Sequence, residues 1–252
     1  MDIKNLKLKI KSKQVKIGVI GLGYVGLPLV CEFASKGISV LGFDIDEKKI
    51  DAIHNGISYI QDISSETVQN LVSKQLVSAT SDFSRLSEMD VISICVPTPL
   101  RKTKDPDMSY IFEAVKSIKA SLREGQIIIL ESTTYPGTTE EVVLPELEST
   151  GLKVGNDFFL AFSPERVDPG NEKYTTKNTP KIIGGVTKEC TQLSKEVYEY
   201  AIDTLVEVSS PKSAEMVKIY ENTFRSVNIA MANEMVLMCD KLGLDVWEVI
   251  DA

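Results

Sequence analysis

The chain has 252 residues, of which 43% are hydrophobic and 25% charged, a composition typical of a folded globular protein with room for one large domain and part of another. Its net charge of −8 argues against nucleic acid as a partner, because such proteins neutralise phosphates with clustered Lys and Arg. No apolar run is long enough to span a membrane and no signal-peptide pattern precedes the first strand, so we expect a cytoplasmic protein with no membrane partner.

Basic residues cluster near the start of the chain, in KNLKLKIKSKQVK at residues 4–16. We interpret this cluster as a solvated leader before the first strand. A tether to an anionic surface is the alternative.

The four cysteines, Cys31, Cys95, Cys190 and Cys239, form no CxxC pair, so the sequence predicts neither a metal site nor a disulfide framework. Cys95 and Cys239 lie in apolar patterns typical of buried core thiols. The single histidine, His54, argues against a Ser/His/Asp relay.

Strand patterns and helical patterns alternate along the chain. The strand patterns cover residues 15–20, 38–45, 90–96, 126–132, 158–164, 181–186 and 204–210, and helical patterns begin near Leu22 and cover 47–54, 65–74, 109–122, 139–148 and 188–201. Continuous Val/Ile/Leu strands separated by helices are typical of a mainly parallel sheet covered on both faces, so we predict an α/β fold. Two loops are long enough to suggest a functional role, at residues 97–107 and 163–180.

The pattern changes after residue 209. No Gly or Pro lies between Lys212 and Leu242, and apolar residues recur there at spacings of three and four, which predicts one long helix whose Met and Val stripe is core or subunit interface. GLDVWEVIDA then begins another helix, with Asp245 as its N-cap. Because so short an apolar helix is unstable alone, we expect the protein to continue beyond residue 252.

The motif GLGYVG follows the first strand and begins a helix. In a dinucleotide-binding turn, Gly21 permits the tight bend, Gly23 lets the backbone approach the pyrophosphate and Gly26 lets helix and strand pack closely. Tyr24 and Val25 would offer backbone N–H groups to the anion. The fold predicted is therefore a Rossmann-type, doubly wound sheet, with a purely structural glycine turn as the alternative.

Asp44 ends the second strand, where it would accept hydrogen bonds from the adenosine ribose hydroxyls. Its charge would repel a 2′-phosphate, so we expect NAD as cofactor. Lys49 either helps at the adenosine end or is an exposed helix lysine.

Polar residues follow three successive strands, in CVPTPL, ESTTYPGTT and FSPERVDPG. Ligands bind at the carboxyl ends of parallel strands, so these loops predict one shared site. Its candidate residues are Thr98, Ser132, Thr133, Glu165 and Arg166.

Lys218 and Asn222 are four residues apart on the long helix, and Arg225 follows three residues later. This spacing aligns them on one helix face, where the Lys and the amide could donate to an oxyanion or a substrate carbonyl. A solvated stripe is the alternative.

Together, GLGYVGLPL, FDID, CVPTPL, ESTTYPGTT, SPERVDPGN and SAEMVKIYENTF resemble the nucleotide-sugar 6-dehydrogenases of the UDP-glucose/GDP-mannose dehydrogenase family, in their UDP-N-acetylhexosamine branch. The resemblance implies an NAD-binding domain at residues 1–209, the start of a central helical dimerisation domain at 210–252, and a C-terminal UDP-binding domain outside this chain. It implies a homodimer through the helix at residues 213–242. The expected product is a uronic acid for surface polysaccharide, formed with two NAD+.

The resemblance also assigns roles to residues. Thr133 would lie near the nicotinamide and the reacting carbon, and Val96 and Thr98 would line the cofactor. Glu165 resembles the glutamate that assists thioester hydrolysis, and Lys218, with Asn222 beside it, resembles the lysine that stabilises alkoxide charge. The substrate-binding residues implied are Glu165, Arg166, Val167, Lys218, Asn222 and Arg225.

The family's nucleophilic cysteine, in a GGHC-type motif, has no match here, and Cys239 precedes the position of that motif. We therefore expect the 252 residues alone to be unable to complete the four-electron oxidation. UDP-N-acetylglucosamine is the expected substrate, followed by its mannosamine epimer and UDP-glucose. The alternatives are a β-hydroxyacid dehydrogenase and a non-catalytic NAD-binding or dimerisation module.

Overall fold

The computed structural model describes residues 3–103, 105–166 and 175–252. Its strands are β1 (Ile17–Ile20), β2 (Val40–Phe43), β3 (Val77–Thr80), β4 (Val91–Ile94), β5 (Gln126–Leu130), β6 (Phe158–Phe162), β7 (Lys181–Gly185) and β8 (Leu205–Glu207). They form one sheet in the order β3-β2-β1-β4-β5-β6-β7-β8, parallel except between β6 and β7. From β1 the chain extends the sheet first toward β3 and then, from β4, in the opposite direction. The doubly wound, mainly parallel sheet predicted from the sequence is confirmed.

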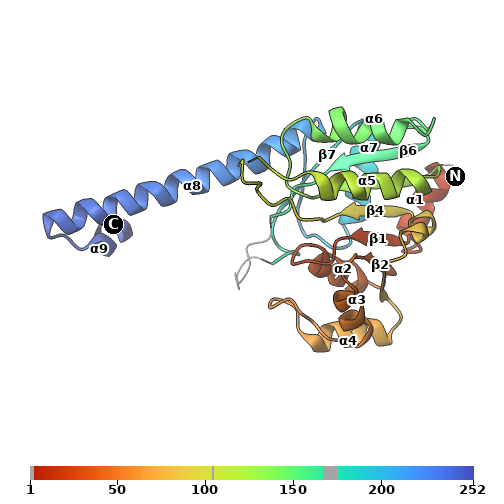
Figure 1. Ribbon diagram of the computed structural model, residues 1–252, viewed down its shortest axis with the longest axis horizontal. Helices are drawn as coiled ribbons and strands as arrows, with labels where there is room; N and C mark the ends of the chain where they lie inside the picture. Colours follow the sequence, from red (N-terminus) through yellow and green to blue (C-terminus); the bar gives the residue numbers. More distant parts are fainter. Residues whose placement is uncertain (1–2, 104, 167–174) are drawn as a thin grey trace.

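Helices cover both faces of this sheet (Figure 1). The helices are α1 (Ile3–Lys11), α2 (Gly26–Ser35), α3 (Glu47–His54), α4 (Ser65–Ser73), the 3-10 helix η1 (Phe83–Glu88), α5 (Ser109–Ser121), the π-helix η2 (Thr138–Val143), α6 (Leu144–Glu148), α7 (Lys188–Tyr198), α8 (Pro211–Leu242) and α9 (Val246–Asp251). One core lies between the sheet and α1, α2, α3, α4 and α7. The other lies beneath η1, α5, α6 and the first turn of α8.

Two features of the sheet were not predicted. β3 reads VSAT, in which Ser78 is exposed and Thr80 half-buried, so it lacks the continuous apolar run of the central strands. β7 runs antiparallel to β6, with Ala161 opposite Gly185. β8 pairs parallel to β7, so these two strands both run opposite to the rest of the sheet.

The prediction of a solvated leader at residues 4–16 is wrong. Residues 3–11 form helix α1, and its Leu6 and Ile10 side chains are buried in the core. The Tyr200 hydroxyl donates to the Ile10 carbonyl at 2.9 Å. The lysines that suggested a solvated segment instead lie on the outer side of an amphipathic helix, one face of which packs against the sheet.

A buried carboxylate also fastens α1 to the body. Asp90, which is 1% exposed, accepts hydrogen bonds from the Lys9 ammonium at 2.9 Å, the Lys16 amide at 3.1 Å and the Arg123 guanidinium at 3.1 Å. Burial acts to raise the pKa of Asp90, but these donors outweigh it and the pKa is lowered. The pairing therefore stabilises the fold above the ordinary Asp pKa, and this stabilisation is lost as the pH falls through the lowered value.

The long helix predicted from residue 212 is confirmed as α8, which projects away from the body with α9 folded back at its far end (Figure 1). Ser210 caps its start by accepting from the Ser213 amide, and Gly243 ends it at φ 68°. Asp245 caps α9 as predicted, through the Trp247 amide at 2.9 Å. Among the described residues, no helix is long and apolar enough to cross a membrane.

Replacing Leu6 by Ala tests the docking of α1. A fully buried leucine truncated to alanine should lower the free energy of unfolding by about 2–4 kcal/mol, measured by urea denaturation. The control is Leu8→Ala, because Leu8 on the same helix is 66% exposed and its loss should cost at most about 0.5 kcal/mol. Equal stabilities for the two variants would contradict the packing of α1 on the core.

Candidate functional site

The glycine turn after β1 has the geometry that a bound dinucleotide requires. Gly21 has φ 92°, and a Cβ there would lie 2.6 Å from the Cys95 carbonyl oxygen. A Cβ at Gly26 would lie 1.8 Å from the Gly21 carbonyl oxygen, so only glycine lets α2 pack this closely. A Cβ at Gly23 would meet nothing within 4 Å, which leaves open space for an approaching phosphate. Val25, the N-cap of α2, makes no side-chain cap, and the helix N-terminus favours an anion.

Asp44 is fastened to the same turn. Its Oδ2 atom accepts from the Leu22 amide at 2.8 Å and from the Lys49 ammonium at 2.9 Å, while Oδ1 accepts from the Asp46 amide at 3.0 Å. The side chain is almost buried, but it borders the adjoining cavity. These donors fix the orientation of the carboxylate, and Lys49 borders the cavity beside it.

A cavity of about 820 Å³ extends along the ends of β2, β1, β4, β5 and β6. All but one of the predicted cofactor residues border it, namely Gly21, Gly23, Tyr24, Val25, Asp44, Lys49, Val96, Thr98, Ser132 and Thr133. The exception, Gly26, lies beneath the turn. The cavity occupies the point where the sheet order reverses between β1 and β4, the usual ligand position in such sheets. The residues present fit a dinucleotide.

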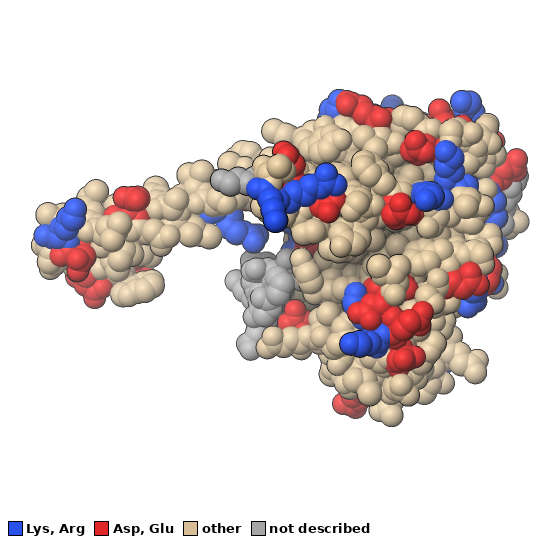
Figure 2. All heavy atoms as spheres, in the orientation of Figure 1, with Lys and Arg blue, Asp and Glu red and all other residues tan. Residues whose placement is uncertain are grey.

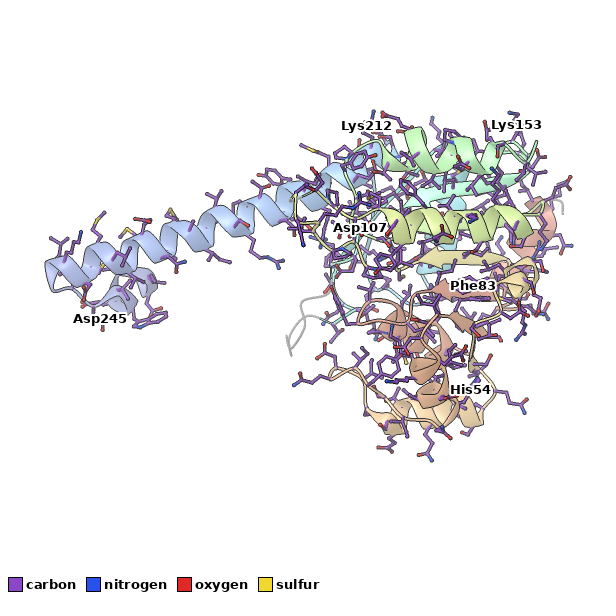
Figure 3. The ribbon with its side chains drawn as sticks, viewed as in Figure 1. His54, Phe83, Asp107, Lys153, Lys212 and Asp245 are labelled. Carbon is purple, nitrogen blue, oxygen red and sulfur yellow. The ribbon has the colours of Figure 1, made fainter. Side chains whose placement is uncertain are left out.

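Another wall of the cavity was not predicted. It includes Tyr110, Glu113 and Ser117 from α5, and Phe83 from η1. The three α5 residues recur at spacings of three and four, so a helical plot of residues 109–121 could have identified them. Phe83 (labelled in Figure 3) follows the unpredicted strand β3, and no sequence signal relates it to the glycine turn.

The loops after β4 and β5 are joined at the far end of the cavity from Asp44. The Ser132 hydroxyl lies 2.7 Å from the Val96 carbonyl oxygen, to which it donates, and Thr133 follows it along the cavity. Cys95 also borders the cavity, where burial raises the pKa of its thiol well above the usual value. That thiol is therefore a poor nucleophile.

Helix α8 brings a lysine to this end of the cavity. The Lys218 ammonium lies 3.5 Å from Oε2 of Glu165, and both side chains are nearly buried, at 12% and 13% exposed. Glu165 follows β6 and itself borders the cavity. Two residues separated by 53 positions, each predicted to act in the site, are thus in contact.

The other predicted substrate residues differ in placement. The Arg166 guanidinium pairs with Glu221 of α8 and also donates to the Pro180 carbonyl. Asn222 and Arg225 are exposed on α8 beyond Lys218, and neither borders the cavity. Val167 lies outside the described residues.

The root of α8 is held by a carboxylate that the sequence did not indicate. Glu215 is fully buried and accepts from the Gly137 amide at 2.5 Å, the Thr139 amide at 2.9 Å and the Thr139 hydroxyl at 2.7 Å. Burial raises its pKa, and the hydrogen bonds only partly oppose this. Glu215 therefore joins α8 to the first turn of η2, which follows the ESTTYPGTT loop.

In the described part of the chain, no cluster of three or more His, Cys, Asp and Glu side chains is arranged to hold a metal ion. The four cysteines are free and buried. The cavity is bordered by the glycine turn, hydroxyl groups, carboxylates and Lys49, and Lys218 contacts Glu165 at its far end.

Fold and site together define a dinucleotide-binding protein, and comparisons with known proteins identify the family. Residues 15–202 match the UDP-glucose/GDP-mannose dehydrogenase family NAD binding domain, and residues 212–252 match the central domain of that family. The chain belongs to this family. The sequence predictions of the family and of NAD as cofactor are confirmed.

Relatives and solved structures show how much of such proteins the chain represents. It is 38% identical over 242 residues to the UDP-N-acetyl-D-glucosamine 6-dehydrogenase of Salmonella typhi, covering 95% of this chain and 56% of that protein. The structure of UDP-D-ManNAc dehydrogenase from Pyrococcus horikoshii is similar at a TM-score of 0.88 and 38% identity, covering 94% of this chain and 57% of that one. The structure of a ternary complex of GDP-mannose dehydrogenase from Pseudomonas aeruginosa is similar at a TM-score of 0.87 and 31% identity, covering 93% of this chain and 55% of that one. The chain spans about half the length of the curated relatives it matches.

Proposed function

We propose that this chain is part of an NAD-dependent 6-dehydrogenase that oxidises the C6 alcohol of a UDP-N-acetylhexosamine to the uronic acid, for surface polysaccharide biosynthesis. One observation carries the proposal. A single cavity is bordered by the glycine turn and Asp44 at one end and by Thr133 and Glu165 at the other, where Lys218 contacts Glu165. Family membership excludes the β-hydroxyacid dehydrogenase alternative.

The glycine turn and Asp44 would orient the cofactor. The open space at Gly23 and the N-terminus of α2 would receive the pyrophosphate, and the Asp44 carboxylate would accept hydrogen bonds from the adenosine ribose hydroxyls. Ser132 and Thr133 then lie at the nicotinamide end. NAD+, when bound, supplies the acceptor for the hydride that leaves C6.

The side chains at the nicotinamide end would manage the charge and the protons at C6. Lys218 carries three N–H donors and pairs with the Glu165 carboxylate, so it can also donate to the C6 oxygen as negative charge develops there. Glu165, nearly buried beside it, would accept a proton as the general base that assists thioester hydrolysis. Asn222, Arg166, Val167 and Arg225 are proposed to hold the sugar nucleotide.

We propose UDP-N-acetylglucosamine as the preferred substrate. The TTYPGTT and SPERVDPGN segments and the similarity to the Salmonella typhi relative support this choice. UDP-N-acetylmannosamine is the second candidate, because the similar Pyrococcus structure is named for that sugar. UDP-glucose is third.

We assign residues 1–209 to the NAD-binding domain and residues 210–252 to the start of a central helical dimerisation domain. The middle of α8 is largely uncharged in Figure 2, while charged residues gather at its far end, and its exposed apolar residues include Phe224, Val227 and Met231. Unpartnered apolar surface of this extent marks an interface, and we assign it to a homodimer.

Calorimetric titration of NAD+ and NADP+ tests the cofactor site. The chain should bind NAD+ more tightly than NADP+, and Asp44→Ala should weaken NAD+ binding by about 10-fold to 100-fold, because hydrogen bonds to a charged acceptor are lost. Asp203→Ala, which removes an exposed carboxylate away from the cavity, is the control and should bind as the wild type. Failure of a folded wild-type chain to bind either nucleotide would refute the proposed site.

The 252 residues alone should not sustain turnover. All four thiols are buried, and burial raises the pKa of Cys31 to about 12 and that of Cys95 far above its usual range, so neither of these two supplies a thiolate nucleophile. Incubation with UDP-N-acetylglucosamine and NAD+ should therefore give no continuing rise in NADH absorbance. NADH in several-fold excess over protein would overturn this expectation.

Light scattering tests the dimer. The chain, of 27.8 kDa, should give twice that mass in solution, and charges introduced at two exposed α8 positions, Val227→Glu with Met231→Glu, should return it to a monomer. Leu8→Glu, on the equally exposed surface of α1, should leave the dimer intact. A monomeric wild type would contradict the assignment.

A further inference from the structure

A buried polar network lies directly behind Thr133. Glu131 directly follows β5, two residues before Thr133, and is 1% exposed, yet it borders the cofactor cavity. Its carboxylate accepts from the Lys181 ammonium at 2.6 Å and from the Tyr198 hydroxyl. The Tyr198 hydroxyl lies 3.1 Å from the Ser93 hydroxyl, and the Lys181 ammonium lies 5.3 Å from the centre of the Tyr198 ring.

Four separate elements meet in this network. Ser93 comes from β4, Glu131 directly follows β5, Lys181 begins β7 and Tyr198 ends α7. The contacts span 50, 67 and 105 positions of the chain. Because all four side chains are buried, packing against their neighbours holds each of them in a fixed position.

Stability alone does not account for the network. Removing two charges from water costs several kcal/mol per ion, and well-packed apolar residues of similar volume are often as stable as a buried ion pair or more so. The remaining sheet core is built from apolar side chains of that kind. A buried ion pair does, however, constrain its partners to one geometry more tightly than apolar contacts do.

The network also connects to the loop that carries Glu165. Lys181 follows Pro180, whose carbonyl accepts from the Arg166 guanidinium. Arg166 in turn pairs with Glu221 of α8, one turn beyond Lys218. Beside the backbone pairing of β5 with β6, the Glu131–Lys181 pair thus joins the strand leading to Thr133 to the segment that contacts Arg166.

We infer that Glu131, Lys181 and Tyr198 are positioning residues for the nicotinamide end of the cofactor cavity. They act through the backbone of Ser132 and Thr133, which follow Glu131 directly. This inference rests on the proposed function, because it assigns the cavity end near Thr133 to the nicotinamide and the end near Asp44 to the adenosine.

The experiment compares NAD+ with ADP-ribose, which lacks only the nicotinamide ring, by calorimetry on the 252-residue chain. The test variant is Glu131→Leu with Lys181→Met, which removes both charges together. The melting temperature of this variant should lie within a few degrees of that of the wild type. Its affinity for NAD+ should fall about tenfold, the loss expected for one misplaced hydrogen bond, while its affinity for ADP-ribose should stay within about twofold of the wild-type value. Asp44→Ala is the matched control, since it should weaken both ligands alike.

A second variant keeps the test decisive if the double variant does not fold. Tyr198→Phe removes only one hydroxyl, and it should still raise the ratio of the NAD+ to the ADP-ribose dissociation constant by about threefold, the weaker effect of a single network member. Unchanged NAD+ binding in a folded double variant, an equal loss of both ligands, or an unchanged ratio in Tyr198→Phe would overturn the inference alone. Absence of NAD+ binding by the wild-type chain would instead overturn the proposed cofactor site, and the inference with it.

Discussion

The arrangement of the site depends on one buried carboxylate, that of Glu215. It accepts hydrogen bonds from the Gly137 amide and from the amide and hydroxyl of Thr139, and so fixes the first turns of α8 to the segment that follows Thr133. Lys218 lies one turn further along that helix and reaches Glu165. Most of the helix projects away from the body (Figure 1), so the contacts of its inner end position Lys218. Glu215 sets that position together with the buried Ala214 and the Arg166–Glu221 pair.

The sequence predicted the parts of the fold whose signal is local. Continuous apolar runs identified the central strands, and the absence of Gly and Pro identified α8. The prediction of a solvated segment at residues 4–16 failed because its six lysines outweighed the helical spacing of Leu6 and Ile10, which becomes meaningful only against a core. The direction of β7 could not be predicted, because it depends on the path of a long loop and on a register formed with β6.

In the candidate site, too, the residues with a local sequence signal could be predicted and those that depend on distant partners could not. The glycine turn and Asp44 were recognisable because their roles are set by neighbours within one β-α-β unit. Glu131 and Glu215 were not, because a buried acid has the same sequence appearance as an exposed one. Their partners lie 50 to 78 positions away. Sequence spacing placed Asn222 and Arg225 on the face of Lys218, but the structure leaves both exposed.

The attachment at Glu215 also makes α8 a lever with a short inner arm and a long outer one. At 1.5 Å per residue, Lys218 lies only about 4.5 Å along the axis from Glu215, whereas Leu242 lies about 40 Å from it. If the helix swings as a rigid rod about that attachment, a displacement at the tip reaches Lys218 reduced about ninefold. A displacement of several ångströms at the exposed outer half therefore changes the distance between Lys218 and Glu165 by only a fraction of one ångström.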